Sequence, residues 1–151
     1  MRTVVRRLVL RVTVDRAFAA CLELLRTPDP RRGVIARRCN PDPPVQGGEV
    51  VSTVAVRDGE RRVDATIVVL DPPHRLATQS GVEGGTGVRT ALSCEPRSDG
   101  ETLITLRSDA ASGLPLFGRA GRIVDSLLLG GSQRRAARAT LRRLRELAEE
   151  G

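Results

Sequence analysis

The chain holds few side chains that could perform acid–base or nucleophilic chemistry. His74 is the only histidine, so it is the first candidate for proton transfer near neutral pH. It follows Pro73 in a turn, where a side chain is normally solvated, and we therefore expect no catalytic role. Cys94 is a candidate nucleophile, but a nucleophilic thiol needs an adjacent base, and His74 belongs to a different hairpin. A buried thiol that packs as a small apolar side chain is the favoured interpretation.

The spacing of the remaining polar residues predicts neither a metal site nor a phosphate site. Asp64 and Asp109 have no neighbouring ligand at a metal-like spacing. The glycines at 84, 85 and 87 do not precede a helix with a lysine, as a phosphate-binding loop requires. We therefore predict no metal and no cofactor, and no catalytic residue is assigned.

The elements that must position any site begin with a strand and a short helix. Val4, Leu8 and Leu10 recur with a period of two, which is typical of a half-buried strand. Asp15 is expected to be the N-cap of a helix that ends before Pro28. The segment 27–32 is expected to form a turn or a second short helix.

Six further strands are expected, and their ranges are 34–39, 49–57, 61–70, 75–82, 88–95 and 102–108. Turn residues separate them, most clearly Asp58-Gly59 and Asp71-Pro72-Pro73. Consecutive hairpins produce an antiparallel sheet, and the helices are segregated from it, which defines the α+β class.

The C-terminal third is expected to be helical with a break. A continuous helix over 116–149 would be about 50 Å long, whereas a compact domain of this size is about 40 Å across. Gly130-Gly131 is the expected bend, because each glycine costs about 1 kcal/mol inside a helix. A basic stripe along the last helix is interpreted as a solvated face, and its members are Arg134, Arg138, Arg142 and Arg145.

Composition limits the partners of the protein. With 151 residues, we expect residues 1–151 to form a single domain. The net charge is +7, but Trp and Tyr are absent, so few rings could stack on bases and we predict no nucleic-acid partner. The first residues form neither a signal peptide nor a membrane span, so no stable membrane insertion is expected. Three widely spaced cysteines indicate a reducing compartment, and we expect the cytoplasm.

Three segments resemble one family in the order in which the family has them. They are VVRRLVLRVTVDRAFAACLEL, VDATIVVLDPPHRLAT and GETLITLRSDAASGLPLFGRAGRIVDSLL, and they resemble the START-like, polyketide-cyclase-like superfamily called SRPBCC. The resemblance implies a helix-grip fold, with a curved antiparallel sheet of about seven strands wrapped around a long C-terminal helix and two short helices after the first strand. It also implies a hydrophobic cavity between sheet and helix.

The more apolar face of each hairpin is expected to face this cavity. The expected pairs are Cys94–Thr102, Leu92–Ile104, Thr90–Leu106 and Val88–Ser108 in one hairpin, and Val69–Leu76, Ile67–Thr78, Ala65–Ser80 and Val63–Val82 in the other. The inward polar groups are then uncharged at neutral pH, namely Thr78, Ser80, Thr90, Cys94, Thr102 and Ser108. The orientation of the first three strands stays open.

These faces define the candidate ligand-binding residues, which are Ile67, Val69, Thr78, Ser80, Thr90, Leu92, Leu106, Ser108, Phe117, Val124 and Leu128. The leading hypothesis is binding of a hydrophobic small molecule, held by apolar burial, with a polyketide-type ligand as the candidate. Two alternatives remain open. One is a polyketide cyclase/dehydratase-like enzyme of secondary metabolism, and the other is a protein-interaction module that uses the Arg-rich terminal helix. The oligomeric state, a homodimer included, is also open.

Overall fold

A seven-stranded antiparallel sheet, two α-helices and one 3₁₀ helix make up the computed structural model. It describes residues 2–80, 86–98, 100–112 and 118–150, with the backbone alone at 86 and 111–132. The elements are β1 (Arg2–Leu10), α1 (Val14–Leu24), η1 (Pro30–Arg32), β2 (Val34–Asn40), β3 (Glu49–Val56), β4 (Gly59–Asp71), β5 (Arg75–Ser80), β6 (Thr86–Ser98), β7 (Glu101–Ser112) and α2 (Gly118–Glu149). The strands lie in the order β1-β7-β6-β5-β4-β3-β2. The expected α+β helix-grip fold is confirmed.

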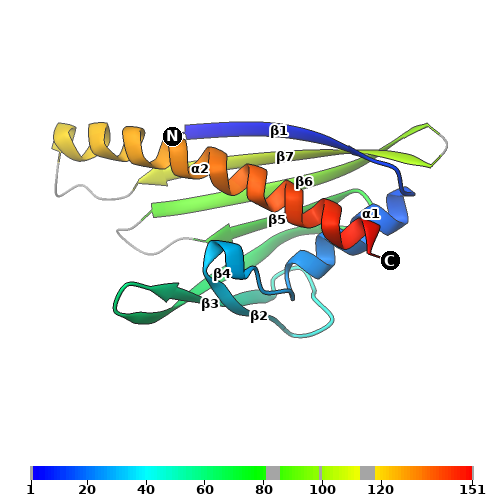
Figure 1. Cartoon of the computed structure of the whole chain (residues 1–151), viewed down its shortest axis with the longest axis horizontal. Helices are drawn as coiled ribbons and strands as arrows, with labels where there is room; N and C mark the ends of the chain where they lie inside the picture. The colour runs from blue at the N-terminus through cyan, green and yellow to red at the C-terminus, as the bar shows by residue number, and fades with distance from the viewer. Residues whose placement is uncertain (1, 81–85, 99, 113–117, 151) are drawn as a thin grey trace.

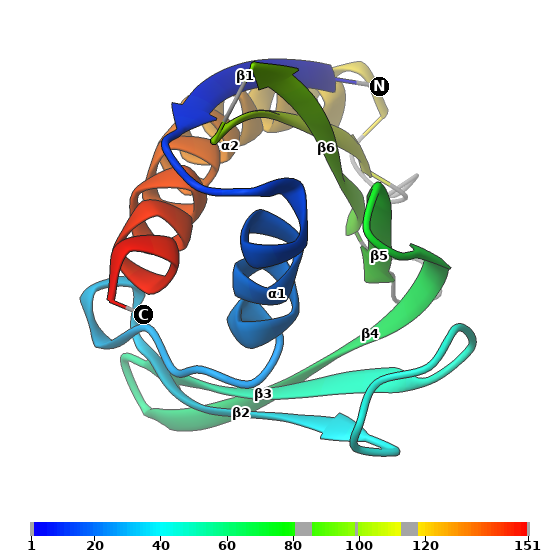
Figure 2. The same ribbon diagram turned by 90° about the vertical axis from the view of Figure 1, so that its right-hand side faces the viewer.

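The sheet curls into an open ring. Figure 2 shows it wrapping around α1, while α2 lies across the gap between β1 at one edge and the η1–β2 region at the other. Figure 1 shows α2 running along the long axis of the molecule. In this arrangement α2 packs on β1, β7 and α1. The two helices therefore cover the concave face, which must be the apolar one. In the part of the chain that the structure describes, no helix is long and apolar enough to cross a membrane.

The β6–β7 hairpin has the expected inward faces but a different register. Cys94 pairs with Ile104 rather than with Thr102, and Leu92 pairs with Leu106. The strands continue through a bulge to a tighter turn, so every expected pair is displaced by two residues. A displacement of two leaves each side chain on its original face, because successive side chains alternate.

A bulge in β4 changes which of its side chains face the cavity. Ile67 pairs with Thr78 as expected, but Leu70, not Val69, pairs with Leu76. One residue is inserted between these two pairs, which reverses the alternation. Val69 therefore lies on the outer face, opposite to Leu70, and the expectation that Val69 faces the cavity is wrong.

The first helix begins two residues earlier than expected. Thr13 is the N-cap, and its Oγ1 accepts a hydrogen bond of 3.3 Å from the backbone N–H of Arg16. Asp15, the expected cap, instead lies in the first turn. A carboxylate there interacts favourably with the positive end of the helix dipole.

The terminal helix has no break, so the bend expected at Gly130-Gly131 is wrong. α2 continues through 32 residues, which corresponds to a length of about 48 Å. The molecule is not spherical, since β6 and β7 have 13 and 12 residues and therefore span about 40 Å each. A long helix can follow these strands, and the packing offsets the cost of two interior glycines, about 1 kcal/mol each.

Thr102 provides a test of the core next to the start of α1. It is fully buried, and its Oγ1 donates a 2.9 Å hydrogen bond to the carbonyl of Val12. We expect Thr102→Val to lower the free energy of unfolding by about 1–3 kcal/mol, because the part-buried carbonyl of Val12 loses its partner. Urea denaturation measures this. Thr105→Val, on the other face of β7, is the matched control and should change stability by less than about 0.5 kcal/mol. Equal effects of the two substitutions would contradict the assignment.

Candidate functional site

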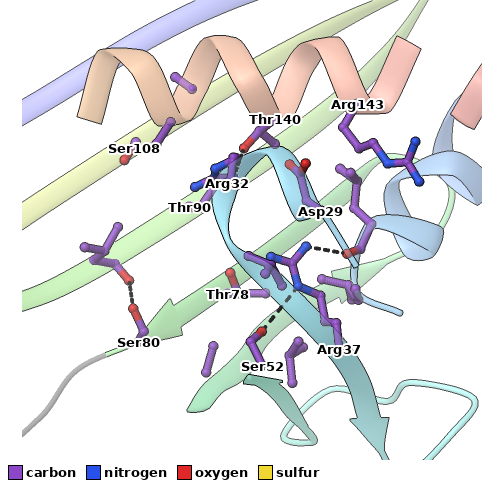
Figure 3. Close-up of a pocket in the computed structure, with 18 of the residues that line it drawn as sticks. Asp29, Arg32, Arg37, Ser52, Thr78, Ser80, Thr90, Ser108, Thr140 and Arg143 are labelled. Carbon is purple, nitrogen blue, oxygen red and sulfur yellow. Dashed lines mark hydrogen bonds between the residues drawn. The ribbon is translucent and has the colours of Figure 1, made fainter. Parts of the chain in front are cut away.

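A cavity of about 410 Å³ lies between the concave face of the sheet, α1 and α2. Its size is within the usual range for small-molecule sites, about 300–1,000 Å³. The described residues that line it come from both helices, from η1 and from β2–β7. Figure 3 shows polar side chains reaching into this space from the sheet, from α2 and from the segment around η1.

Three rows of side chains cross the sheet along β5, β6 and β7 and form one wall of the cavity. Residues directly opposite each other in antiparallel strands point to the same face, so each row follows from the pairing. The rows are Leu76–Leu92–Leu106, Thr78–Thr90–Ser108 and Ser80–Val88–Ala110. The wall is therefore apolar next to α1, hydroxylated in the middle and made of small side chains beyond.

The hydroxyl row is only partly used by the protein itself. Gln133 of α2 is buried, and its Nε2 donates to Ser108 Oγ at 3.2 Å, to the Ser108 carbonyl at 2.7 Å and to the Arg2 carbonyl at 3.0 Å. Within the described residues, the hydroxyls of Thr78 and Thr90 make no hydrogen bond. They remain available to a carbonyl or hydroxyl group of a ligand.

Charged side chains line the cavity where η1 and β2 approach α2. They are Asp29, Arg32, Arg37 and Arg143. Sequence reasoning missed these four residues, because its set of uncharged inward groups came from the two hairpins alone. Arg37 lies on a strand whose orientation was left open, Asp29 and Arg32 lie in or next to the short segment after α1, and Arg143 was not singled out on α2.

The Arg37 guanidinium is held in a defined position. Its Nη1 donates to the Leu24 carbonyl at 2.8 Å, and its Nε donates to Ser52 Oγ at 3.3 Å. Burial, and after it the positive charge of Arg32, lowers the pKa of Arg37 from its ordinary value, while Asp29 opposes this effect. An arginine nevertheless stays protonated in proteins. Arg37 is thus a fixed, half-buried cation that faces the cavity.

Two thiols meet where α1 packs on the sheet. The Sγ atoms of Cys21 and Cys94 are 3.8 Å apart and both residues are buried. The hydrogen bond with Cys94, together with burial, raises the pKa of Cys21. Because only the thiolate is a good nucleophile, Cys21 is a poor candidate for catalysis although it lines the cavity.

We expect Cys21 to react slowly in the folded protein. Its raised pKa lowers the thiolate fraction at neutral pH, and its burial restricts access. Iodoacetamide at pH 7.5 should alkylate Cys21 on the order of 100-fold more slowly than in guanidinium, since reaction requires local opening. Peptide mass spectrometry measures the labelling of each cysteine. Labelling of Cys21 at the unfolded rate would contradict its burial.

The structure brings together most of the candidate ligand-binding residues. Those that line the cavity are Thr78, Ser80, Thr90, Leu92, Leu106 and Ser108. Ile67 is fully buried but does not line it, and Val69 faces outward. Phe117 lies outside the described residues, and so do the side chains of Val124 and Leu128.

Other lining residues were missed by sequence reasoning. On α2 they include Gln133, Ala137 and Thr140, whose spacing of three to four residues is the helical signal that could have found them. His74 is exposed in the β4–β5 turn and does not line the cavity. Across the described ranges, no three His, Cys, Asp or Glu side chains are grouped as metal ligands would be.

The fold and the cavity between sheet and helices define a helix-grip protein, and comparison of the sequence with family models agrees. Residues 1–149 match the family described as "Polyketide cyclase / dehydrase and lipid transport". The chain belongs to this family, within the polyketide-cyclase-like superfamily that its segments resemble. Comparison with curated proteins gives no match.

Solved structures show the same fold at low sequence identity. The Zhui aromatase/cyclase from Streptomyces sp. R1128 superposes with a TM-score of 0.76 at 16% identity, covering 98% of this chain and 93% of that one. The di-domain ARO/CYC StfQ of the steffimycin biosynthetic pathway has a TM-score of 0.72 at 19% identity. The match covers 98% of this chain and half of StfQ. Norcoclaurine synthase from Thalictrum flavum has a TM-score of 0.68 at 13% identity, covering 99% and 87%.

Proposed function

We propose that the protein binds a hydrophobic small molecule, of polyketide type, in the cavity between the sheet and α2. The observation that carries this proposal is the cavity wall itself. A row of three leucines provides apolar area, and in the adjacent row the hydroxyls of Thr78 and Thr90 have no partner among the described residues. A polyketide-type chain alternates apolar carbons with oxygen atoms, which matches such a wall.

Family membership and the fold shared with two aromatase/cyclases support the class of ligand. Burial of apolar ligand surface would supply about 25 cal/mol per Å². The hydroxyls would set the orientation of the ligand rather than its affinity, since a net hydrogen bond contributes about 1 kcal/mol. The cavity favours ligand binding over a protein-interaction module that works through the exposed arginines of α2.

A cyclase/dehydratase-like enzyme is a second candidate because of Asp29. This residue is only 7% exposed, it lines the cavity, and its carboxylate has no hydrogen-bond or ion-pair partner among the described residues. Acid–base catalysis needs a titratable group within reach of the reacting atoms. Asp29 would serve as that group, while the walls would hold a reactive chain in a folded conformer.

Two measurements test ligand binding. Native mass spectrometry of the protein purified from its own cells should show a bound species of added mass that is lost on denaturation. The neutral probe N-phenyl-1-naphthylamine should bind to the emptied protein with one site and a large fluorescence increase, and decanol should displace it. Absence of both a bound species and probe binding would rule out the proposed function.

A further inference from the structure

The charge of the cavity wall is concentrated at one end and is not balanced. Arg32, Arg37 and Arg143 line this end, and Asp29 is the one acidic side chain among the described lining residues. Behind them, Glu146 forms 3.0 Å ion pairs with Arg143 and with the neighbouring Arg31. Four arginines therefore face two carboxylates, and two positive charges are in excess.

Arg37 is the centre of this excess charge. No carboxylate lies within ion-pair distance of its guanidinium, since the described ion pairs do not include it. Its Nε and one N–H of Nη1 are occupied by Ser52 and Leu24, so the second N–H of Nη1 and both N–H groups of Nη2 are left to donate. Arg32 reaches the same end from η1 and donates from Nη1 to Thr140 Oγ1 at 3.2 Å. A half-buried cation without an anion is costly, and a ligand anion would supply the missing partner.

This charged end also borders a second cavity. A space of about 240 Å³ lies beside the first, and Asp29, Arg32 and Arg143 line both. The leucine and hydroxyl rows belong to the first cavity only. A ligand with a charged group at the shared wall could keep that group near the surface while its apolar part lies on the rows of the sheet.

From this arrangement we infer the class of ligand: an amphipathic anion whose carboxylate or phosphate group binds Arg37 and Arg32 and whose apolar chain extends over Leu76, Leu92 and Leu106. The inference rests on the proposed function, because it names the ligand class of the same cavity. Guanidinium groups suit these anions, since their planar donors match two oxygen atoms. Asp29 opposes the anion and would limit its affinity.

Isothermal titration with decanoate, decyl phosphate and decanol tests the inference on the emptied protein at pH 7.5. The three share a chain length and differ in the head group. We expect at least one of the two anions to bind about tenfold more tightly than decanol, as one charge-assisted hydrogen bond provides. Whichever of the two anions binds more tightly identifies the preferred head group, carboxylate or phosphate. Equal affinity for all three would overturn the anion inference and leave the proposed function standing. Failure of all three to bind would overturn both.

Three variants separate a charge effect from loss of structure. Arg37→Gln should weaken binding of the preferred anion about tenfold and leave decanol within about twofold, which also shows that the cavity is still formed. Arg38→Gln is the matched control, because Arg38 is the next residue of β2 and is exposed; it should change neither affinity. Asp29→Asn removes the opposing charge and should strengthen anion binding severalfold. Unchanged anion affinity in both Arg37→Gln and Asp29→Asn would overturn the inference.

Discussion

Leu144→Ala is expected to lower the free energy of unfolding by about 3–4 kcal/mol. Leu144 is fully buried, with 0% of its surface accessible to water. It belongs to the same core cluster as Leu24 of α1 and Ile104 of β7. Truncation removes apolar contacts and leaves a void that close-packed neighbours fill only in part. The effect is large because this side chain helps to attach α2 to the rest of the fold.

Chemical denaturation followed by circular dichroism measures this loss. Arg145→Ala is the control, because the next residue of α2 is exposed and its replacement should cost less than about 0.5 kcal/mol. A loss below about 1 kcal/mol for Leu144→Ala would show that α2 does not close the sheet as the structure has it. The cavity would then lose one of its walls.

Thr90→Trp is expected to weaken binding of a neutral apolar ligand by on the order of 70-fold. Thr90 is the middle residue of the hydroxyl row, paired with Thr78 on one side and Ser108 on the other. An indole ring there occupies the space that a ligand would take. If it covers roughly 100 Å² of wall, the ligand loses about 2.5 kcal/mol of apolar burial, which corresponds to that factor.

Titration with decanol and with N-phenyl-1-naphthylamine measures the change. Thr66→Trp is the matched control, since Thr66 is exposed on β4 outside the cavity and the same substitution there should leave affinity within about twofold. The chain has no tryptophan of its own, so fluorescence also reports where each ring lies. The tryptophan introduced at position 90 is expected to emit at shorter wavelength, as a buried indole does, and the one at position 66 at the wavelength of an indole in water. Unchanged affinity in Thr90→Trp would place the ligand elsewhere.

Much of the fold was predictable because it depends on local patterns. Alternation with a period of two identified the strands, and Asp58-Gly59 marked the β3–β4 turn. The faces of β6 and β7 were also predicted, although the register was wrong by two residues. An error of two does not change a face, because the side-chain alternation has the same period. The bulge in β4 inserts a single residue, and it therefore moved Val69 to the wrong side.

The continuous helix α2 contradicts an expectation that was based on the diameter of a compact domain. The expected bend at Gly130-Gly131 came from treating the domain as a sphere, whereas long β6 and β7 strands make it elongated. Tertiary packing can outweigh the unfavourable helix propensity of two glycines, because propensity is a weak preference.

By itself, the sequence determined the strands, the closing helix and the hydroxylated faces of β5–β7, which follow from residue periodicity. Its resemblance to one superfamily indicated the family and the cavity. Only the tertiary structure decided the charged end. Arg37 and Arg38 are adjacent and have the same charge, so composition cannot tell which one faces inward. The bulge between Val34 and Ala36 and the pairing of Arg37 with Ser52 settle it. Asp29 and Arg143 both line this end because the curled sheet brings the η1 segment before β2 against α2 (Figure 2), where Arg31 binds Glu146 and Arg32 binds Thr140. These segments are more than a hundred residues apart in the chain, so the contact does not follow from a local pattern.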